Sequence, residues 1–334
     1  MIPKICCEIE FWNAFVNSLD EAIQNSKINP NASNKLLQLW RAIYNLKSDI
    51  FFNCSKEQIV QKVQKIKQDP KSDECFLTLW KQSANGCRDI RCIDSAAMFE
   101  DENFVNANYN IVYFSKDTMQ TPSLQEYGIL NVCFDDLEKY DYKKEKYIER
   151  NSVNRTSWKN YEEYIAHPCN SIVLIDNYIL ANEQVINTDF MELIQMLLPS
   201  KSLAIPVHIF IITQEKMPLS SMYQKVNDCI KQCRPQLNFS LTICPSSEFH
   251  DRCIITNNAY IWCGAGFGIF KKQGYVNKPT TISKSFFFYD YYYDQLASQQ
   301  EDSSVKTAKK ILNHVKKIST TTRSEGAKEH RLLK

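Results

Sequence analysis

The chain has 334 residues, of which 44% are hydrophobic and 23% charged, and its formal net charge is +2 at pH 7. These values are typical of a soluble globular protein with one large or two ordinary domains. So small a net charge excludes a global field that would attract nucleic acid or membranes. The sequence shows no membrane-spanning apolar run and no signal-peptide core. The thirteen cysteines, an odd number without paired spacing, favour a reducing compartment, and we expect a cytoplasmic protein.

Residues 1–150 predict a helix-rich α/β domain. Ser55 precedes a helical pattern and is expected to cap that helix. Apolar residues at helical spacing predict helices over residues 8–25, 34–46, 58–67 and 72–83. Short apolar runs predict strands over residues 49–53, 90–93, 111–114 and 128–134.

A densely charged segment with frequent tyrosines covers residues 135–155. We interpret it as a solvated helix or a mobile connector, in preference to a ligand-binding arm. It is also the expected junction between the N-terminal domain and the C-terminal half of the chain.

From His167 onward, strand and helix patterns alternate, which is typical of an α/β layer and predicts a domain over residues 165–300. The run 171–175 is continuously apolar, so this strand is expected to be buried on both faces. Asp176 and Tyr178 follow it, at the end where open α/β sheets bind ligands. The remaining predicted strands are 207–213, 237–244, 253–256, 260–263 and 284–293, and the predicted helices are 189–198 and 220–233.

The last segment, residues 301–334, is predicted to be a basic amphipathic helix with a tail. Over residues 303–334, Lys and Arg outnumber Glu by nine to two. One interpretation is a helix docked on the domain with a frayed basic end. The other is an attachment site for the phosphates of nucleic acid or anionic lipid.

The strongest candidate site lies in residues 249–270. His250, Asp251 and Arg252 form a polar trio, two short strands follow, and three of the seven glycines of the chain fall within residues 264–268. Glycine permits positive φ and close approach of the backbone to a ligand. Gly264, Gly266, Asp176 and Tyr178 are therefore candidate ligand-binding residues.

The spacing of this stretch resembles the phospholipase D superfamily signature, in which Arg252, Asn257 and Gly264 stand at the offsets expected from His250. Two residues depart from it. Arg252 replaces a lysine but still binds phosphate through a forked, permanent charge, and Asn257 replaces an aspartate. The motifs HDR, N-x-x-x-I and G-x-G-x-x-x-F resemble one branch of the superfamily more than its general signature. This branch is the phospholipase D-like domain at the C-terminus of MIT-domain proteins, which is non-catalytic, dimeric and phospholipid-binding.

The resemblance implies a phospholipase D-like mixed sheet and, in active members, a metal-independent phosphodiesterase built from two motifs. One histidine attacks phosphorus and a second protonates the leaving oxygen. Because His250 is the only histidine in such a motif here, catalysis implies a homodimer, with Arg252 clamping the oxyanion and Asn257 orienting His250. We predict no metal and no cofactor; Cys229 and Cys233 alone supply too few ligands.

Alternatives remain for each residue and for the whole chain. His250 is a catalytic nucleophile, a phosphate ligand or a structural residue, and Arg252 is a phosphate hook or the ion-pair partner of Asp176, Asp251 or Glu248. The chain is a dimeric nuclease, a non-catalytic module for nucleic acid or anionic lipid, or an interaction protein that binds a protein partner through residues 1–160. Its composition suggests a bacterial defence-type system.

Overall fold

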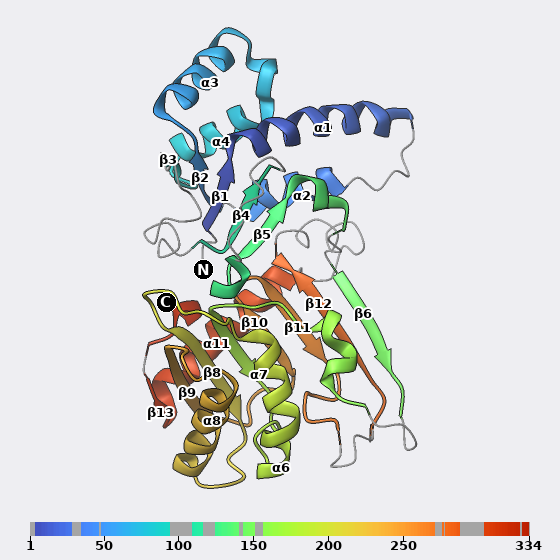
Figure 1. Ribbon diagram of the computed structural model, residues 1–334, viewed down its shortest axis with the longest axis vertical. Helices are drawn as coiled ribbons and strands as arrows, with labels where there is room; N and C mark the ends of the chain where they lie inside the picture. Colours follow the sequence, from blue (N-terminus) through green and yellow to red (C-terminus); the bar gives the residue numbers. More distant parts are fainter. Residues whose placement is uncertain are drawn as a thin grey trace.

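The structure is a computed structural model of the chain. It describes residues 4–28, 35–46, 48–93, 109–115, 124–139, 143–150, 156–270, 276, 278–287, 304–327 and 329–333. These residues form two β-sheets flanked by helices, which confirms the mixed α/β class. Figure 1 shows the N-terminal sheet with its helices above and the larger C-terminal sheet below.

The first sheet has five strands in the order β3-β2-β1-β4-β5, and every neighbouring pair is parallel. Its strands are β1 (Lys4–Glu8), β2 (Asp49–Asn53), β3 (Ile90–Ile93), β4 (Ile111–Phe114) and β5 (Leu130–Cys133). This is the strand order of a doubly wound α/β sheet. Since all five strands run in one direction, their carboxyl ends share one edge of the sheet.

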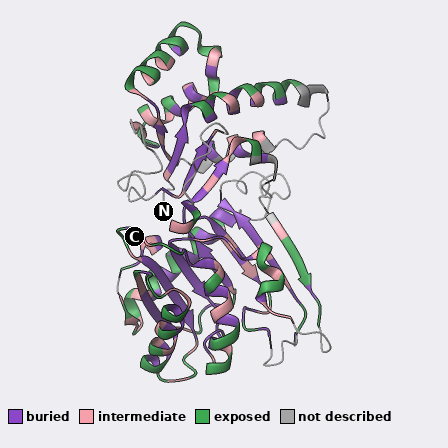
Figure 2. Ribbon diagram, in the orientation of Figure 1, coloured by how far each residue is buried: buried purple, intermediate pink, exposed green. Residues whose placement is uncertain are grey.

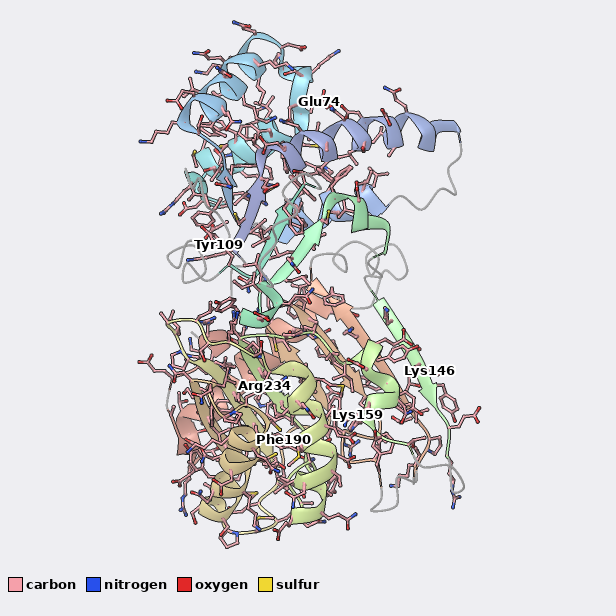
Figure 3. All side chains as sticks on the ribbon, viewed as in Figure 1. Glu74, Tyr109, Lys146, Lys159, Phe190 and Arg234 are labelled. Carbon is pink, nitrogen blue, oxygen red and sulfur yellow. The ribbon has the colours of Figure 1, made fainter. Side chains whose placement is uncertain are left out.

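Four helices cover one face of this sheet: α1 (Ile9–Ile28), α2 (Lys35–Leu46), α3 (Lys56–Gln68) and α4 (Glu74–Ala84), with the short turns η1 (Pro70–Asp73) and η4 (Phe134–Lys139). The short turn η3 (Leu124–Tyr127) packs on the opposite face. Alternate strand residues such as Ile5 and Phe52 pack against Trp12 and Phe76 of the helices. The other face packs on a smaller cluster around Tyr109, which lies between the two sheets in Figure 3. Ser55 forms a capping box with Gln58, so the predicted cap of α3 is confirmed.

The central strand β1 is not among the predicted strands. It runs directly into α1, because Glu8 ends the strand and Ile9 begins the helix. No glycine, proline or other turn residue marks the boundary between the strand and the helix. Two of the five residues of β1 are cysteines, which favour neither strand nor helix. Pairing with β2 and β4 on both sides fixes this segment as a strand.

The second sheet has eight strands in the order β13-β9-β8-β7-β10-β11-β12-β6. β7, β8 and β9 are parallel, and the other pairs are antiparallel. All five residues of β7 are buried, as predicted. The strands are β6 (Lys143–Ile148), β7 (Ser171–Ile175), β8 (Val207–Thr213), β9 (Phe239–Pro245), β10 (Cys253–Thr256), β11 (Ala259–Cys263), β12 (Thr280–Phe286) and β13 (Glu325–Gly326).

Helices cover both faces of the second sheet. One face packs on η5 (Trp158–Tyr164), α6 (Glu183–Val185), the π-helix η6 (Ile186–Phe190), α7 (Met191–Leu197) and α8 (Leu219–Cys233). The opposite face packs on α11 (Ser304–Thr321), whose buried residues include Val315 and Ile318. The short η7 (Arg331–Leu333) ends the described chain. Figure 2 shows the central strands of this sheet as mostly buried and the edge strand β6 as mostly exposed.

The charged segment 135–155 contains a strand where we expected a helix or a connector. β6 pairs with β12 along the edge of the second sheet, and Figure 3 labels its Lys146. An edge strand has one neighbour and exposes most of its side chains, so its sequence is polar. Among residues 144–148 of β6, only Ile148 is buried. The predicted strand 284–293 is β12, which begins earlier at Thr280, and residues 288–293 lie outside the described part.

The two sheets meet at the amino ends of their parallel strands. Asn110, which precedes β4, donates from Nδ2 to the Asn257 carbonyl at 3.2 Å, and the Asn170 backbone N–H before β7 donates to Asn257 Oδ1 at 3.0 Å. Gly128 (φ +74°), which precedes β5, lies directly on the backbone of Cys169 and Asn170. The carboxyl ends of the two parallel strand sets therefore point away from each other (Figure 1).

Candidate functional site

The candidate site lies at the carboxyl edge of the second sheet, the edge remote from the N-terminal sheet. Asp176 directly follows β7, and β10 runs antiparallel to β7 with Cys253 opposite Ile175. The loop that ends in His250, Asp251 and Arg252 therefore arrives beside Asp176. The pairing brings together the polar trio and the acidic residue, which are about 75 residues apart in the sequence.

Asp176 is 1% exposed and is held by the backbone. Its Oδ2 accepts from the Phe267 N–H at 2.5 Å and its Oδ1 from the Tyr178 N–H at 2.7 Å. Burial raises the pKa of this carboxyl, while the two N–H donors and the nearby Arg252 charge oppose that rise. Through these contacts Asp176 links the glycine-rich loop, residues 264–268, to the end of β7.

Arg252 contacts the same glycine-rich loop. Its Nη1 donates to the Gly264 carbonyl at 2.9 Å, and its Nε is buried without a hydrogen-bond partner among the described residues. A Cβ placed on Gly266 (φ +91°) would lie 2.6 Å from Asp176 Oδ2 and 2.7 Å from Arg252 Cδ. The two side chains thus enclose Gly266, and the guanidinium binds the protein's own groups.

The glycine-rich loop makes close contacts of its own with the protein. Besides Gly266, a Cβ on Gly264 would meet the Trp262 ring at 3.2 Å, and one on Gly268 would meet Val185 at 3.2 Å. Trp158 also donates from its indole Nε1 to the Phe267 carbonyl at 2.9 Å. In these contacts the glycines of the candidate site allow dense internal packing, and protein atoms occupy the space expected for a ligand.

His250 is exposed, as is the following Asp251, and no hydrogen bond is seen for the His250 side chain among the described residues. The adjacent Phe249 is buried and packs on the His314 ring of α11, with ring centroids 4.7 Å apart. Glu248 accepts from His314 Nε2 at 3.3 Å. The His250 loop is therefore anchored on α11, and its histidine faces solvent beside that helix.

Asn257 does not lie with His250. It follows the far end of β10, where its Oδ1 accepts from the Asn170 N–H and its Nδ2 donates to the Gly128 carbonyl at 3.4 Å. The expected orientation of His250 by Asn257 does not fit this geometry, because the length of β10 separates the two residues. Asn257 instead joins the two sheets.

Two further residues near the site were not predicted. Asp189 is 1% exposed within the π-helix η6, its Oδ2 has no hydrogen-bond partner among the described residues, and burial raises its pKa to about 8. Because Asp189 is the first residue of the predicted helix 189–198, its position in the sequence suggests an exposed acid in the first turn of that helix. Lys216 lies over the ring of Tyr178, 5.7 Å from its centroid, and Tyr178 is 46% exposed.

The described residues contain neither a candidate metal site nor a candidate membrane-spanning helix. No cluster of three or more His, Cys, Asp and Glu side chains with the geometry of a metal site occurs in that part of the chain. Within the same residues, no helix has both the length and the apolar character needed to cross a membrane.

Comparison with known proteins supports the second sheet as a recognised domain. Residues 158–284 match the family described as "Phospholipase D-like domain at C-terminus of MIT". None of the curated proteins compared with the chain matches it. One matching solved structure is TrmBL2, an archaeal chromatin protein with a novel mode of DNA binding, at 14% identity and a TM-score of 0.23; the match covers 45% of this chain and 49%, or about half, of that chain. The C-terminal half of the chain thus contains a phospholipase D-like domain.

Proposed function

We propose that the phospholipase D-like domain is a non-catalytic module that binds phosphate groups. The observation that supports this most strongly is the state of Arg252. Its guanidinium donates to the Gly264 carbonyl and lies beside the buried Asp176. An arginine that is held by a backbone carbonyl beside a buried acid is not free to clamp a transferring phosphoryl group.

The geometry within one chain also lacks the other parts of a hydrolase. Attack and protonation of the leaving group need two histidines in one cleft. His250 has neither an orienting partner among the described residues nor a second motif histidine beside it, and Asn257 is bound at the opposite end of β10. These features favour binding over hydrolysis.

The surface that we assign to phosphate binding is the outer face of α11. This helix carries five lysines and His314 and contains no acidic residue, and its lysines are all exposed. Through His314 it contacts the loop of His250. Its apolar face is buried against the second sheet, so it cannot insert into a bilayer while docked. Binding to nucleic acid or anionic lipid would then rest on charge alone.

The test compares the wild type with Lys309→Gln/Lys316→Gln/Lys317→Gln in fluorescence anisotropy with oligonucleotides and in co-sedimentation with phosphatidylserine vesicles. We expect at least tenfold weaker binding to the preferred ligand and a shallower salt dependence, by about 0.9 in log–log slope per lost duplex phosphate contact. The control Lys159→Gln/Lys231→Gln/Lys278→Gln removes the same charge from exposed positions elsewhere. Equal loss in both variants, or no binding by the wild type, would refute the assignment.

A second candidate function is hydrolysis by a homodimer with one His250 from each chain. The exposure of His250 at the sheet edge favours it, because a partner's motif could face it there. The test is cleavage of single- and double-stranded DNA and RNA in EDTA by the wild type and by His250→Ala. Cleavage that disappears with His250 would establish the nucleophile. Intact substrate with folded wild type leaves the binding module as the function.

A further inference from the structure

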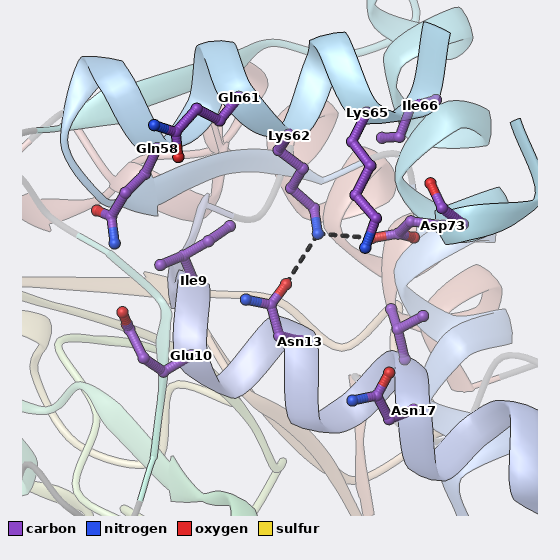
Figure 4. A pocket seen from close by; sticks show the side chains of 12 residues that line it. Ile9, Glu10, Asn13, Asn17, Gln58, Gln61, Lys62, Lys65, Ile66 and Asp73 are labelled. Carbon is purple, nitrogen blue, oxygen red and sulfur yellow. Dashed lines mark hydrogen bonds and ion pairs between the residues drawn. The ribbon is translucent and has the colours of Figure 1, made fainter. Parts of the chain in front are cut away.

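A cavity of about 370 Å³ lies between α1 and α3 in the N-terminal half, outside the phospholipase D-like domain (Figure 4). α1 begins directly at the end of β1 and α3 begins two residues after β2. The cavity therefore lies at the carboxyl edge of the first sheet, beside the first turn of α1. The volume lies within the usual range for small-molecule sites.

One wall of the cavity holds a fixed cation. Lys62 of α3 is 14% exposed, and its Nζ donates to Asn13 Oδ1 at 2.8 Å and pairs with Asp73 Oδ2 at 2.8 Å. Asp73 also accepts from the Trp12 indole N–H at 2.9 Å and the Phe76 N–H at 2.8 Å, so its own position is set by the core. Two of the three ammonium protons of Lys62 are thus used, which leaves one donor.

The other donors of the cavity are unused within the described residues. Lys65 lies one turn from Lys62 on the same face of α3, and no ion pair is seen for it among these residues. Ser72 lines the cavity and its hydroxyl oxygen is buried without a hydrogen-bond partner in this part of the chain. In Figure 4, Lys62 and Lys65 extend from α3 towards α1. A buried hydroxyl without a partner is costly, so it marks a place where a polar ligand group would be stabilised.

The remaining side chains that line the cavity indicate which kind of organic group the ligand carries. Amide side chains supply donors and acceptors at once, and apolar side chains supply a surface for a ring. The amides are Asn13, Asn17, Gln58 and Gln61, and the apolar side chains are Ile9, Val16 and Ile66. The acid Glu10 limits the negative charge that fits near α1.

We propose that this cavity binds a small organic phosphate of the nucleoside monophosphate class. The phosphate lies between Lys65 and Lys62 with the Ser72 hydroxyl as a further donor, and the base or sugar lies along the amide side chains. The first turn of α1 adds the positive end of a 20-residue helix dipole. This site is independent of the phosphate-binding face of α11, since it lies on the other sheet.

The test is isothermal titration of the full chain with AMP, adenosine and inorganic phosphate. We expect AMP to bind with a Kd below about 1 mM, at least tenfold tighter than adenosine and at least threefold tighter than phosphate. Lys65→Gln should weaken AMP about tenfold, the usual effect of losing one charge-assisted hydrogen bond. Glu10→Gln should strengthen AMP binding, because it removes one of the two acids of the lining, and the other, Asp73, is paired with Lys62.

The matched control is Lys67→Gln, which removes the same charge from an exposed position of α3 that does not line the cavity. Unchanged affinity in this control supports the site, and an equal loss in Lys65→Gln and Lys67→Gln overturns it. Adenosine binding as tight as AMP, phosphate binding as tight as AMP, or the absence of any titration by folded wild type would also overturn it. Because Lys65 is exposed, Lys65→Gln should keep the wild-type melting temperature.

Discussion

Gly128 is the residue on which the contact between the two halves of the chain depends most directly. Its φ is +74°, and an added Cβ would lie 2.6 Å from the Cys169 carbonyl carbon and 2.7 Å from the Asn170 nitrogen. Backbone atoms cannot move aside as the end of a flexible side chain can. The glycine therefore serves both its own conformation and the close approach of the two sheets.

We expect Gly128→Ala to lower the free energy of unfolding by about 3 kcal/mol or more, since the left-handed conformation alone costs roughly 1–2 kcal/mol and the backbone clash adds to it. Urea denaturation measures the loss. Gly86→Ala is the matched control, because Gly86 has a φ of +68° but no atom within 4 Å of an added Cβ. It should cost only about 1 kcal/mol. Equal losses in the two variants would contradict the close contact.

Asp176 is predicted to be a structural residue. Asp176→Asn replaces one acceptor oxygen by an N–H donor facing a backbone N–H and removes the charge beside Arg252. We expect a loss of about 3 kcal/mol in the free energy of unfolding, measured in urea. Asp251→Asn, at the exposed neighbour of Arg252, should change stability by less than about 0.5 kcal/mol. A stable Asp176→Asn variant that lost only ligand binding would favour a ligand role instead.

At the scale of elements, α11 combines two functions on opposite faces. Its apolar residues close the core over the second sheet, while its lysines remain outside. This is the docked helix that was one of the two interpretations of residues 303–334, and β13 beyond it pairs with β9. The lysine-rich edge strand β6 closes the other side of the sheet and discourages pairing with another chain there.

Leu312→Ala on the buried face of α11 should lower the free energy of unfolding by roughly 2–5 kcal/mol, because Leu312 is 5% exposed and its removal leaves a cavity. Lys316→Ala on the exposed face should cost less than about 0.5 kcal/mol. Thermal and urea denaturation of both variants test this. Similar small losses would mean that the helix does not contribute to the core in solution.

Three buried groups make opposite contributions to the pH dependence of the stability of the whole molecule. Burial lowers the pKa of both His167 and His330 to about 3, so only the unfolded chain takes up these protons as the pH falls below 6.5. Burial raises the pKa of Asp189 to about 8, so only the unfolded chain releases this proton as the pH rises from about 4 to 8. Each unmatched proton changes stability by about 1.4 kcal/mol per pH unit.

The contribution of the two histidines is lost as the pH falls below about 6.5, and that of Asp189 is lost as the pH rises from about 4 to 8. Urea midpoints of the wild type, Asp189→Asn and His330→Gln at pH 4.5, 6.5 and 8 isolate each contribution. Relative to the wild type, Asp189→Asn should gain stability as the pH rises, and His330→Gln should gain stability as the pH falls. The same pH dependence in the wild type and in Asp189→Asn would contradict the burial of Asp189.

The local sequence determined most of the elements and the family of the second sheet. Hydrophobic periodicity located β2, β7, β8 and β10, because buried strands carry uninterrupted or alternating apolar residues. Ser55 marked the start of α3 through a hydrogen bond within four residues. The spacing from His250 to Gly264 pointed to the phospholipase D-like domain that the family comparison supports. All these signals are local in the chain.

Tertiary structure alone decided where each candidate site residue lies and what it contacts. β1 and β6 are strands because their neighbours in the sheets, which are distant in sequence, supply their hydrogen bonds. Asn257 and His250 share a motif, yet an extended strand of four residues holds them at opposite edges of the sheet. From the sequence, Arg252 and the glycines are candidates for binding a phosphate or another ligand. In the structure, Asp176 at the end of β7 occupies the space between Arg252 and Gly266. Spacing along the chain does not encode which distant side chain fills a site; only packing decides that.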